Sequence, residues 1–420
     1  MNVTPDHLTR ATRRLRQHPL DYGAWLEVAA LLEALGGPDD AELAFGTIGE
    51  SARLGGQVAL AIACGRHLAQ IGSVRGPELI EQVIDTYAEI KAPKGKRKKQ
   101  ITRPPTEPIP TVSVPQVPEG DGTPLEEARL LVTKLGEWLT KREVANRPLA
   151  PLVSSLSKLG ARALVGVMTA RAVPAGTVII DAGEPATALY WIAHGTVIVA
   201  RGKGYPMAGT TADIPVLGEL HSGAFFGEIA LVGGTKRTAR VTAHDDVWLL
   251  EIPARAVETA AQKHPKLAEV LAIHARQRLL ANLMRTSELF RALEDDDRDA
   301  LLAKFTTQLV PEGTMFIHEG QANEFLWVVV SGRCQVKAAG AAITELGPGA
   351  AVGEISLVSG AVAVADVEAI EPAVLLRLSK QDFDVVAQKH PALLAEVEKL
   401  VVAREQANRA LFQDATDLIV

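Results

Sequence analysis

Residues 223–239 of the 420-residue chain read GAFFGEIALVGGTKRTA, and a related stretch returns later in the sequence. The Gly-Glu-Ile of residues 227–229 recurs at residues 353–355, at an offset of 126. The Ala-Gln-Lys-His-Pro of residues 261–265 recurs unchanged at residues 387–391, again at an offset of 126. A constant offset over both motifs indicates two copies of one fold.

The start of the repeat has a different offset. Val-Pro-Ala-Gly-Thr at residues 173–177 recurs as Val-Pro-Glu-Gly-Thr at residues 310–314, at an offset of 137. The first copy is therefore longer by 11 residues, the difference between 137 and 126. The extra residues fall in and around the Gly- and Pro-containing stretch 201–206, where an insertion costs little free energy.

Within each copy, short apolar runs rich in β-branched residues alternate with glycines, and helical patterns lie at both ends. In the first copy these runs cover residues 177–180, 189–193, 196–200, 240–243 and 247–252. Many short strands at this spacing predict an antiparallel sandwich or roll. We therefore expect an α+β protein with two tandem antiparallel β-rolls of jelly-roll type, flanked by helices and preceded by an all-α helical-repeat-like module.

The N-terminal segment reads as helices separated by short turns. Trp25, Val28, Ala29 and Leu32 follow the i, i+3, i+4, i+7 spacing of a helix that ends at the Gly-Gly-Pro of residues 36–38. Further helices are expected over residues 39–54, 57–71 and 77–90. The stretch from residue 18 to residue 44 resembles a tetratricopeptide-type hairpin, although the motif is not cleanly restated downstream. A plain small helical bundle is the alternative.

Residues 91–124 have a different composition. Seven Lys and Arg side chains lie within residues 91–103, and eight prolines lie within residues 91–124. Proline at this density disfavours both helix and sheet, which predicts an extended, mobile linker. Its basic part can contact anionic lipid, nucleic acid or an acidic protein surface, or it can serve as a solvated spacer.

These patterns predict five parts. An amphipathic stripe that includes Leu267, Leu271 and Leu279 marks a long helix between the two copies. The parts are a helical, tetratricopeptide-like module at 1–90, a basic Pro-rich linker at 91–124, a first β-roll with a leading helix at 125–270, a connecting helix at 271–286, and a second β-roll with a C-terminal helix at 287–420.

Composition excludes several classes of protein. With 44 basic and 50 acidic residues, the net charge of −6 argues against a wholly basic nucleic-acid binder. Cys64 and Cys334 form no disulfide or zinc pattern, which favours a reducing compartment. No stretch approaches the roughly 18 apolar residues of a membrane span, and the N-terminus has no signal-peptide pattern, so a soluble cytoplasmic protein is expected.

Catalytic and metal-binding motifs are also missing from the sequence. It contains no Walker loop, nucleophile elbow, His-Glu-x-x-His or Cys-x-x-Cys motif, so we expect no enzyme, no cofactor and no metal site. The sequence ends in Asp-Leu-Ile-Val at residues 417–420 after a helical pattern, so we expect no helix-turn-helix DNA-binding domain.

The stretch at residues 223–239 resembles the phosphate-binding cassette of the cyclic nucleotide-binding domain family, which includes protein kinase A regulatory subunits, cyclic-nucleotide-gated channels and catabolite activator proteins. The resemblance extends over residues 150–270 and 287–400. It implies a cAMP or cGMP ligand in the first copy. The implied ligand-binding residues are Gly227, Glu228, Ile229, Ala230, Arg237, Thr238 and Ala239.

The residue types fit that chemistry. Gly227 allows a ligand to approach the backbone closely, and the free N–H groups of Ile229 and Ala230 can then point at a phosphate. Arg237 presents a planar, permanently charged donor pair to the phosphate oxygens. Glu228, an acceptor when ionised, suits the ribose 2′-hydroxyl, and the resemblance gives the two charged residues these roles.

Two further cassette positions carry hydroxyl and backbone groups, and one alternative stays open. Thr238 and Ala239 would add a hydroxyl and backbone contacts to the ligand. In the alternative interpretation, Glu228 and Arg237 form a pair that merely fixes a turn.

Arg240 stands where the family usually has Ser or Thr, and this second cation can either add phosphate affinity or point outward.

The second copy lacks the charged residue. At the offset of 126, Arg237 corresponds to Ala363 and Arg240 corresponds to Asp366. Loss of one charged hydrogen bond costs about 1.5–3 kcal/mol, or roughly ten- to a hundred-fold in affinity. The second β-roll is therefore predicted not to bind cyclic nucleotide and to act as a packing or interface module.

Three functional hypotheses follow. The first is a cyclic-nucleotide sensor that binds ligand in the first copy and passes occupancy, through the helix after it, to an unidentified protein partner held by the N-terminal helices or the basic linker. The second is a ligand-independent scaffold. The third is a kinase inhibitor similar to protein kinase A regulatory subunits, for which Lys-Lys-Gln-Ile-Thr at residues 98–102 is only a loose pseudosubstrate match.

Overall fold

A computed structural model describes residues 3–89, 114–141, 150–200, 216–286 and 304–389, with a few positions of the last helix between 391 and 402. Most of the predicted linker, the insertion of the first copy and the end of the chain lie outside the described residues. The predictions for those segments therefore remain predictions.

The N-terminal part is helical, as predicted. Its five helices are α1 (Pro5–Gln17), α2 (Tyr22–Gly36), α3 (Pro38–Leu54), α4 (Val58–Gln70) and α5 (Arg75–Tyr87). Trp25, Val28, Ala29 and Leu32 are all buried, which confirms the predicted stripe. Gly37, with φ of +91°, ends α2 and begins α3, a backbone conformation that favours glycine. The tetratricopeptide resemblance remains a prediction.

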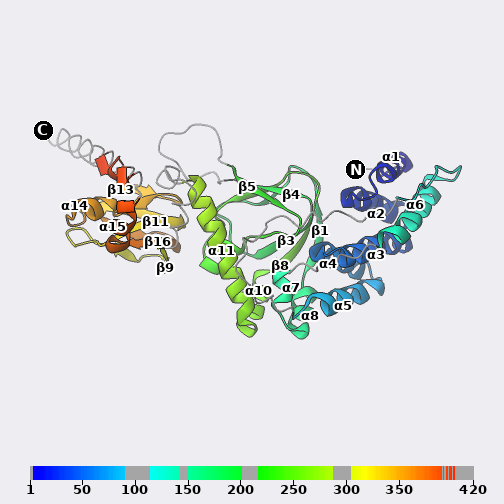
Figure 1. Cartoon of the computed structure of the whole chain (residues 1–420), viewed down its shortest axis with the longest axis horizontal. Helices are drawn as coiled ribbons and strands as arrows, with labels where there is room; N and C mark the ends of the chain where they lie inside the picture. Colours follow the sequence, from blue (N-terminus) through cyan, green and yellow to red (C-terminus); the bar gives the residue numbers. More distant parts are fainter. Residues whose placement is uncertain are drawn as a thin grey trace.

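Three more helices precede the first sheet: α6 (Pro124–Leu139), α7 (Pro151–Ser154) and α8 (Lys158–Gly166). Helix α6 begins where the prolines end, because Thr123 and Glu126 form a capping box at its N-terminus. Its Arg129 donates two hydrogen bonds to the buried carboxylate of Asp40 on α3, at 2.6 and 2.8 Å. Helix α6 therefore packs against the helical module (Figure 1).

The first β-roll consists of two antiparallel sheets, with strand orders β1-β8-β3-β6 and β2-β7-β4-β5. The strands are β1 (Thr169–Val173), β2 (Val178–Ile180), β3 (Ala188–His194), β4 (Thr196–Ala200), β5 (Val216–His221), β6 (Phe225–Phe226), β7 (Arg240–Ala243) and β8 (Val247–Pro253). Helix α9 (Glu228–Gly233) follows β6, and helices α10 (Ala254–Lys263) and α11 (Pro265–Thr286) follow β8.

The second β-roll repeats this arrangement, with strand orders β9-β16-β11-β14 and β10-β15-β12-β13. Its strands are β9 (Thr306–Val310), β10 (Met315–Ile317), β11 (Phe325–Ser331), β12 (Cys334–Ala338), β13 (Ala341–Leu346), β14 (Ala351–Val352), β15 (Asp366–Ala369) and β16 (Ala373–Ser379). Helix α14 (Glu354–Ser359) stands where α9 stands in the first copy, and α15 (Lys380–Lys389) follows β16. The predicted α+β fold with two tandem antiparallel β-rolls is confirmed.

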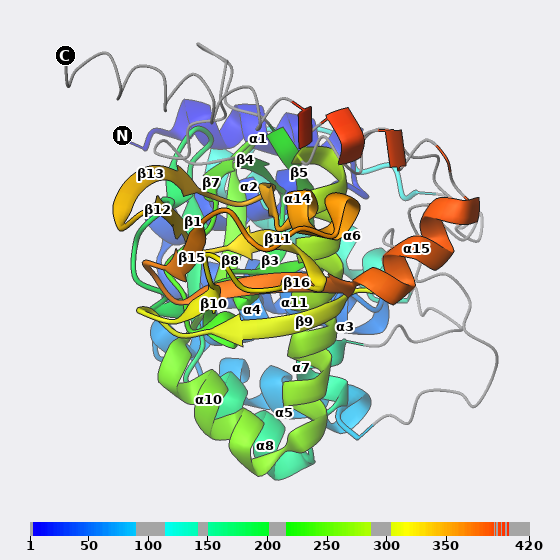
Figure 2. The ribbon, with the colours of Figure 1, turned by 90° about the vertical axis from the view of Figure 1, so that its left-hand side faces the viewer.

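Helix α11 contacts both β-rolls. It packs along α9 of the first roll and touches β11 of the second. Its Arg276 donates a hydrogen bond of 3.4 Å to the carbonyl oxygen of Phe305, just before β9. Figures 1 and 2 show this helix running between the two rolls. The connecting helix predicted at 271–286 thus forms part of a longer helix.

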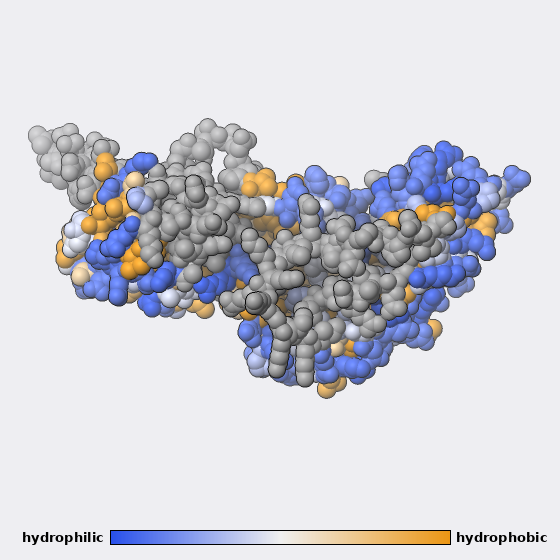
Figure 3. Space-filling view, viewed as in Figure 1, coloured by the Kyte–Doolittle hydropathy of each residue, from blue (hydrophilic) through white to orange (hydrophobic). Residues whose placement is uncertain are grey.

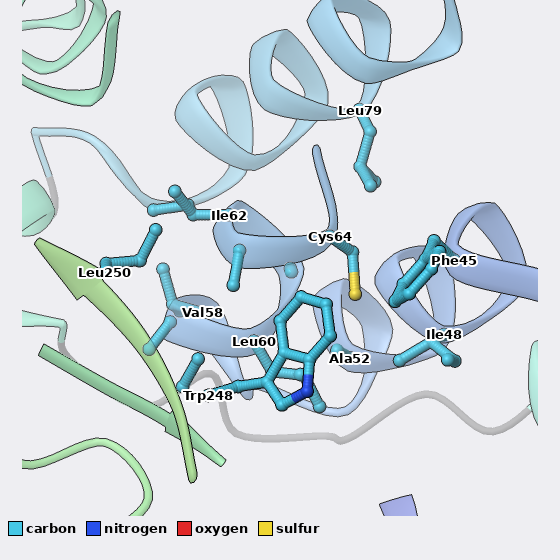
Figure 4. Packing of buried hydrophobic residues seen from close by; sticks show 14 of the residues in the cluster. Phe45, Ile48, Ala52, Val58, Leu60, Ile62, Cys64, Leu79, Trp248 and Leu250 are labelled. Atoms are coloured by element: carbon cyan, nitrogen blue, oxygen red, sulfur yellow. The ribbon is translucent and has the colours of Figure 1, made fainter. Parts of the chain in front are cut away.

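One hydrophobic cluster joins the helical module to the first β-roll. Trp248 and Leu250 of β8 lie against Phe45, Leu60 and other side chains of α3 and α4 (Figure 4). The ring centroids of Trp248 and Phe45 are 5.3 Å apart. The helices therefore cover the β1-β8-β3-β6 sheet and share its core.

The outer surface is mixed in character. The face in Figure 3 is largely hydrophilic over the helical module and carries hydrophobic patches over the second β-roll. In the described part of the chain, no helix has both the length and the apolar character needed to cross a membrane.

Candidate functional site

The site predicted from sequence is one continuous segment between β6 and β7. Gly227 begins it with a φ of +90°, and a Cβ atom there would lie 2.6 Å from Nη1 of Arg237. Glycine is therefore required both for the backbone conformation and for the close approach of the guanidinium. Helix α9 then carries Glu228, Ile229 and Ala230 in its first turn.

Arg237 is buried, with only 4% of its surface exposed. Its Nη1 donates to the carbonyl oxygen of Gly227 at 3.0 Å, and its Nη2 donates to the carbonyl oxygen of Ala188 at 2.6 Å. The guanidinium carbon lies 5.9 Å from the centre of the Tyr190 ring. Burial lowers the pKa of Arg237, and Tyr190 and nearby acidic residues oppose that shift. Within the described ranges no carboxylate forms an ion pair with this cation, and both of its Nη atoms donate to backbone carbonyl oxygens.

Glu228 is also buried, at 1% exposure. Its Oε1 lies 3.4 Å from Nη1 of Arg278 on α11, and neither carboxylate oxygen has a hydrogen-bond partner within the part of the chain that the structure describes. Burial raises the pKa of Glu228, and the charges of Arg278 and Arg237 lower it. The ion pair of Glu228 is thus with Arg278, and the alternative Glu228–Arg237 pair does not form among the described residues.

The remaining predicted residues lie in the same segment. Ala230 is buried in α9, and Thr238 and Ala239 are half-buried in the stretch that leads into β7. Ile229 is half-buried, and its side chain packs against the hydrophobic cluster of the second β-roll. Arg240 is paired with Asp181 and not with a cassette residue. Its Nε and Nη2 donate to the two carboxylate oxygens of Asp181 at 2.9 and 2.5 Å.

Comparison with known families identifies the fold of both copies. The family model described as "Cyclic nucleotide-binding domain" matches residues 170–264 and 307–390, which are the two β-rolls. Both β-rolls belong to the cyclic nucleotide-binding domain family. We refer to them below as the first and second cyclic nucleotide-binding domains.

Individual proteins share this similarity over part of their length. The chain is 36% identical to a cyclic nucleotide-gated potassium channel of Rhizobium etli over 155 residues, which are 36% of this chain and 40% of that protein. It is 24% identical to a cAMP-dependent protein kinase regulatory subunit of Candida albicans over 238 residues, which are 55% of this chain and 47% of that protein. The chain thus spans less than half the length of these relatives.

One solved structure is also reported as similar to this chain. The regulatory domain of Toxoplasma gondii PKA with cAMP matches with 18% sequence identity and a TM-score of 0.29. The match covers 61% of this chain and 92% of that chain.

The second cyclic nucleotide-binding domain reproduces the backbone of the first cassette without its arginine. In the first domain, the N–H of Gly183 donates to the carbonyl oxygen of Arg237 at 2.9 Å, and the N–H of Arg237 donates to the carbonyl oxygen of Glu184 at 2.8 Å. In the second domain, the N–H of Gly320 donates to the carbonyl oxygen of Ala363, and the N–H of Ala363 donates to that of Gln321, both at 2.8 Å. Ala363 therefore occupies the backbone position of the missing arginine.

Asp366 of the second domain has a local partner. Its Oδ1 accepts a hydrogen bond of 2.7 Å from the N–H of Glu319. This carboxylate therefore accepts a backbone hydrogen bond from the loop between β10 and β11. The prediction that the second domain does not bind nucleotide remains a prediction.

Sequence reasoning missed Arg278 as a site residue. Its guanidinium contacts Glu228 and lies 5.9 Å from the Phe225 ring, and the ring of His274, also on α11, lies 4.7 Å from the same phenylalanine. A signal for it existed, because the offset of 126 that relates the two copies also relates Arg278 to Arg404. Arg404 lies outside the described residues.

Proposed function

We propose that the first cyclic nucleotide-binding domain binds cAMP or cGMP, that the second does not, and that the protein is a non-catalytic regulator. The observation that supports this most strongly is the buried guanidinium of Arg237. Its two described hydrogen bonds go to the backbone carbonyl oxygens of Gly227 and Ala188 rather than to a carboxylate. A phosphate would supply the counter-charge that such a buried cation lacks.

Binding would rearrange two contacts. The phosphate oxygens would accept hydrogen bonds from Arg237 and from the N–H groups at the start of α9. The ribose 2′-hydroxyl would donate to Glu228, whose carboxylate oxygens have no hydrogen-bond donor in the described structure. The ligand would therefore compete with Arg278 of α11 for this carboxylate. Occupancy of the site would in this way act on α11.

Calorimetric titration of the full chain with cAMP and with cGMP tests the ligand. We expect one site per chain, and the ratio of the two affinities gives the preferred base. No heat and no melting shift at millimolar concentrations of either nucleotide would rule out the sensor and favour the scaffold. Two equivalent sites would contradict the assignment of binding to the first domain alone.

The pH dependence of binding should report on Glu228. Burial raises its pKa above the ordinary 4.5, and only the ionised form accepts the ribose hydroxyl without a competing proton. Nucleotide affinity should therefore fall as the pH is lowered through that raised pKa. Titrations at a series of falling pH values should show this loss in the natural protein, and Glu228→Gln should bind more weakly on the alkaline side of that pKa with a flatter profile.

The raised pKa of Glu228 affects folding stability in the opposite direction from nucleotide affinity. A raised folded-state pKa means that the neutral carboxyl favours folding, and this contribution is lost as the pH rises through the folded pKa. Glu228→Gln should therefore gain stability relative to the natural protein on the alkaline side of that pKa. Identical pH profiles of affinity for both proteins would contradict the role of Glu228.

Contacts between the cassette and the second domain support a proposal for how occupancy is passed on. The side chain of Ile229 packs against the hydrophobic cluster of that domain, and a Cβ on Gly233 would lie 3.0 Å from Val374 of β16. Nζ of Lys236 lies 3.9 Å from Oε1 of Glu371, next to β16. We propose that movement of α9 and α11 on binding shifts the second domain, which presents the change to a protein partner.

Hydrogen exchange tests this route. Saturating cyclic nucleotide should slow amide exchange in residues 228–239 and also alter it in α11 and in β16, because these two elements lie against the cassette. Arg237→Ala with the same nucleotide is the control and should show no change. Protection confined to residues 228–239 would show that occupancy is not passed on.

A ligand-independent scaffold is the second candidate. The second domain favours it, since this domain keeps the whole fold although its arginine is replaced by Ala363. A kinase partner is a lesser candidate that rests on the similarity to a cAMP-dependent protein kinase regulatory subunit. The stretch at 98–102 that would act as a pseudosubstrate lies outside the described residues.

A further inference from the structure

Asn323 makes, in the second domain, the contacts that Arg237 makes in the first. Its Nδ2 donates to the carbonyl oxygens of Phe325 and Gly353, at 2.7 and 3.3 Å. By the offsets of 137 and 126, these two residues correspond to Ala188 and Gly227. Ala188 and Gly227 are the residues whose carbonyl oxygens accept from Arg237.

The glycines show the same equivalence. A Cβ on Gly353 would lie 2.5 Å from Nδ2 of Asn323, just as a Cβ on Gly227 would lie 2.6 Å from Nη1 of Arg237. Each glycine has a positive φ, +87° and +90° respectively. In each domain the absence of a side chain at this glycine therefore leaves room for a nitrogen donor.

The donor comes from a different place in the chain in each domain. Asn323 corresponds to Ala186 at the offset of 137, and Arg237 corresponds to Ala363 at the offset of 126. Each domain thus has one polar side chain and one alanine at these two positions, in exchanged order. In the second domain the donor precedes β11, whereas in the first it follows α9.

The amide of Asn323 is held in one orientation. Its Oδ1 accepts from the backbone N–H of Phe325 and from Nε1 of Trp327, both at 3.4 Å. Trp327 corresponds to Tyr190, the ring beside Arg237, at the offset of 137. The amide nitrogen and the amide oxygen of Asn323 therefore both form hydrogen bonds, and their partners lie where the surroundings of Arg237 lie in the first domain.

We propose that Asn323 takes the structural place of the missing cassette arginine in the second domain, and that this exchange of a guanidinium for a neutral amide makes the domain insensitive to cyclic nucleotide. A guanidinium can exchange carbonyl acceptors for phosphate because the new hydrogen bonds join opposite charges. A neutral amide gains no such charge by leaving its carbonyl partners. Asn323 therefore keeps the second cassette in the ligand-free arrangement. The ligand part of this inference rests on the proposed function of the first domain.

A thermal cycle tests the structural part without any ligand. Asn323→Ala should lower the melting temperature of the second domain by about 2–4 °C, because two partly buried carbonyl groups lose a donor. Adding Ala363→Arg to that variant should restore part of the loss, whereas Ala363→Arg alone should not stabilise the protein. Gln321→Ala, at an exposed neighbouring position, is the control and should leave melting unchanged.

Titration tests the ligand part. The variant with both Asn323→Ala and Ala363→Arg should raise the stoichiometry from one nucleotide per chain to two, and each single variant should stay at one. The reverse exchange, Ala186→Asn with Arg237→Ala, should keep the first domain folded and abolish its binding. This pair keeps the test decisive if an arginine at the buried Ala363 position prevents folding.

The outcomes are distinct. If Asn323→Ala leaves melting unchanged, or if arginine gives no rescue in a folded double variant, Asn323 does not replace the arginine. A stoichiometry that stays at one in the folded double variant would overturn the claim that this exchange removed binding. If the natural protein binds no nucleotide, the proposed function fails. The thermal cycle then still decides whether Asn323 takes the structural place of the arginine.

Discussion

Replacing Arg237 with alanine should lower the affinity for cyclic nucleotide by more than about a hundred-fold. Each charged hydrogen bond to phosphate contributes about 1.5–3 kcal/mol, or roughly ten-fold to a hundred-fold, and the guanidinium can offer two of them. The side chain is already placed, because the backbone carbonyl groups of Gly227 and Ala188 accept hydrogen bonds from it. Calorimetric titration of the folded variant measures the loss.

Two controls separate ligand binding from structural damage. Arg240→Ala removes a nearby cation that is paired with Asp181, and it should change the affinity only a few-fold because this guanidinium already has a carboxylate partner. Arg237→Ala combined with Ala186→Asn should return a donor to the two carbonyls and recover stability without recovering affinity. Undiminished binding by Arg237→Ala would place the nucleotide site elsewhere.

Replacing Trp248 with alanine should reduce the free energy of unfolding by about 3–5 kcal/mol, the usual cost of removing a large buried aromatic side chain. Trp248 is 9% exposed, and its ring centre lies 5.3 Å from that of Phe45 and 5.4 Å from that of His67. Because this cluster joins β8 to α3 and α4, the helical module and the first domain should lose stability together.

Denaturant unfolding followed by far-ultraviolet circular dichroism, with hydrogen exchange to locate the change, measures this effect. Val74→Ala is a suitable control, because Val74 is 77% exposed next to α5 and should change stability by less than about 0.5 kcal/mol. If Trp248→Ala destabilises the first domain and leaves exchange in α3 and α4 unchanged, the two parts do not share a cooperative core.

Local patterns predicted much of the fold. The two sequence offsets correctly indicated two copies, and the predicted runs at 196–200 and 240–243 coincide with β4 and β7. The helix stripe around Trp25 is buried as expected. Strands β1, β5 and β6 were not predicted, because Arg171 interrupts the apolar run in β1, Gly218 and Glu219 interrupt it in β5, and β6 has only two residues.

The candidate site was predicted as a segment but not as a set of contacts. Gly227 has the positive φ that its motif requires, and Arg237 is buried beside it. The pairing of Glu228 with Arg278 could not be inferred from periodicity, because an amphipathic stripe shows that a helix packs but does not identify its neighbour. The same limit applied to Asn323, which lies 40 residues before the arginine position that it replaces.

The sequence by itself determined that this protein has two copies of one domain, where each cassette lies, and that only the first keeps the arginine. These properties depend on residue type and spacing, which are read directly along the chain. Only the tertiary structure decided that α11 reaches Glu228, that α3 and α4 share a core with β8, and that Asn323 stands at the arginine's place. Those properties depend on contacts between residues distant in sequence, and only the packing of the folded chain brings them together.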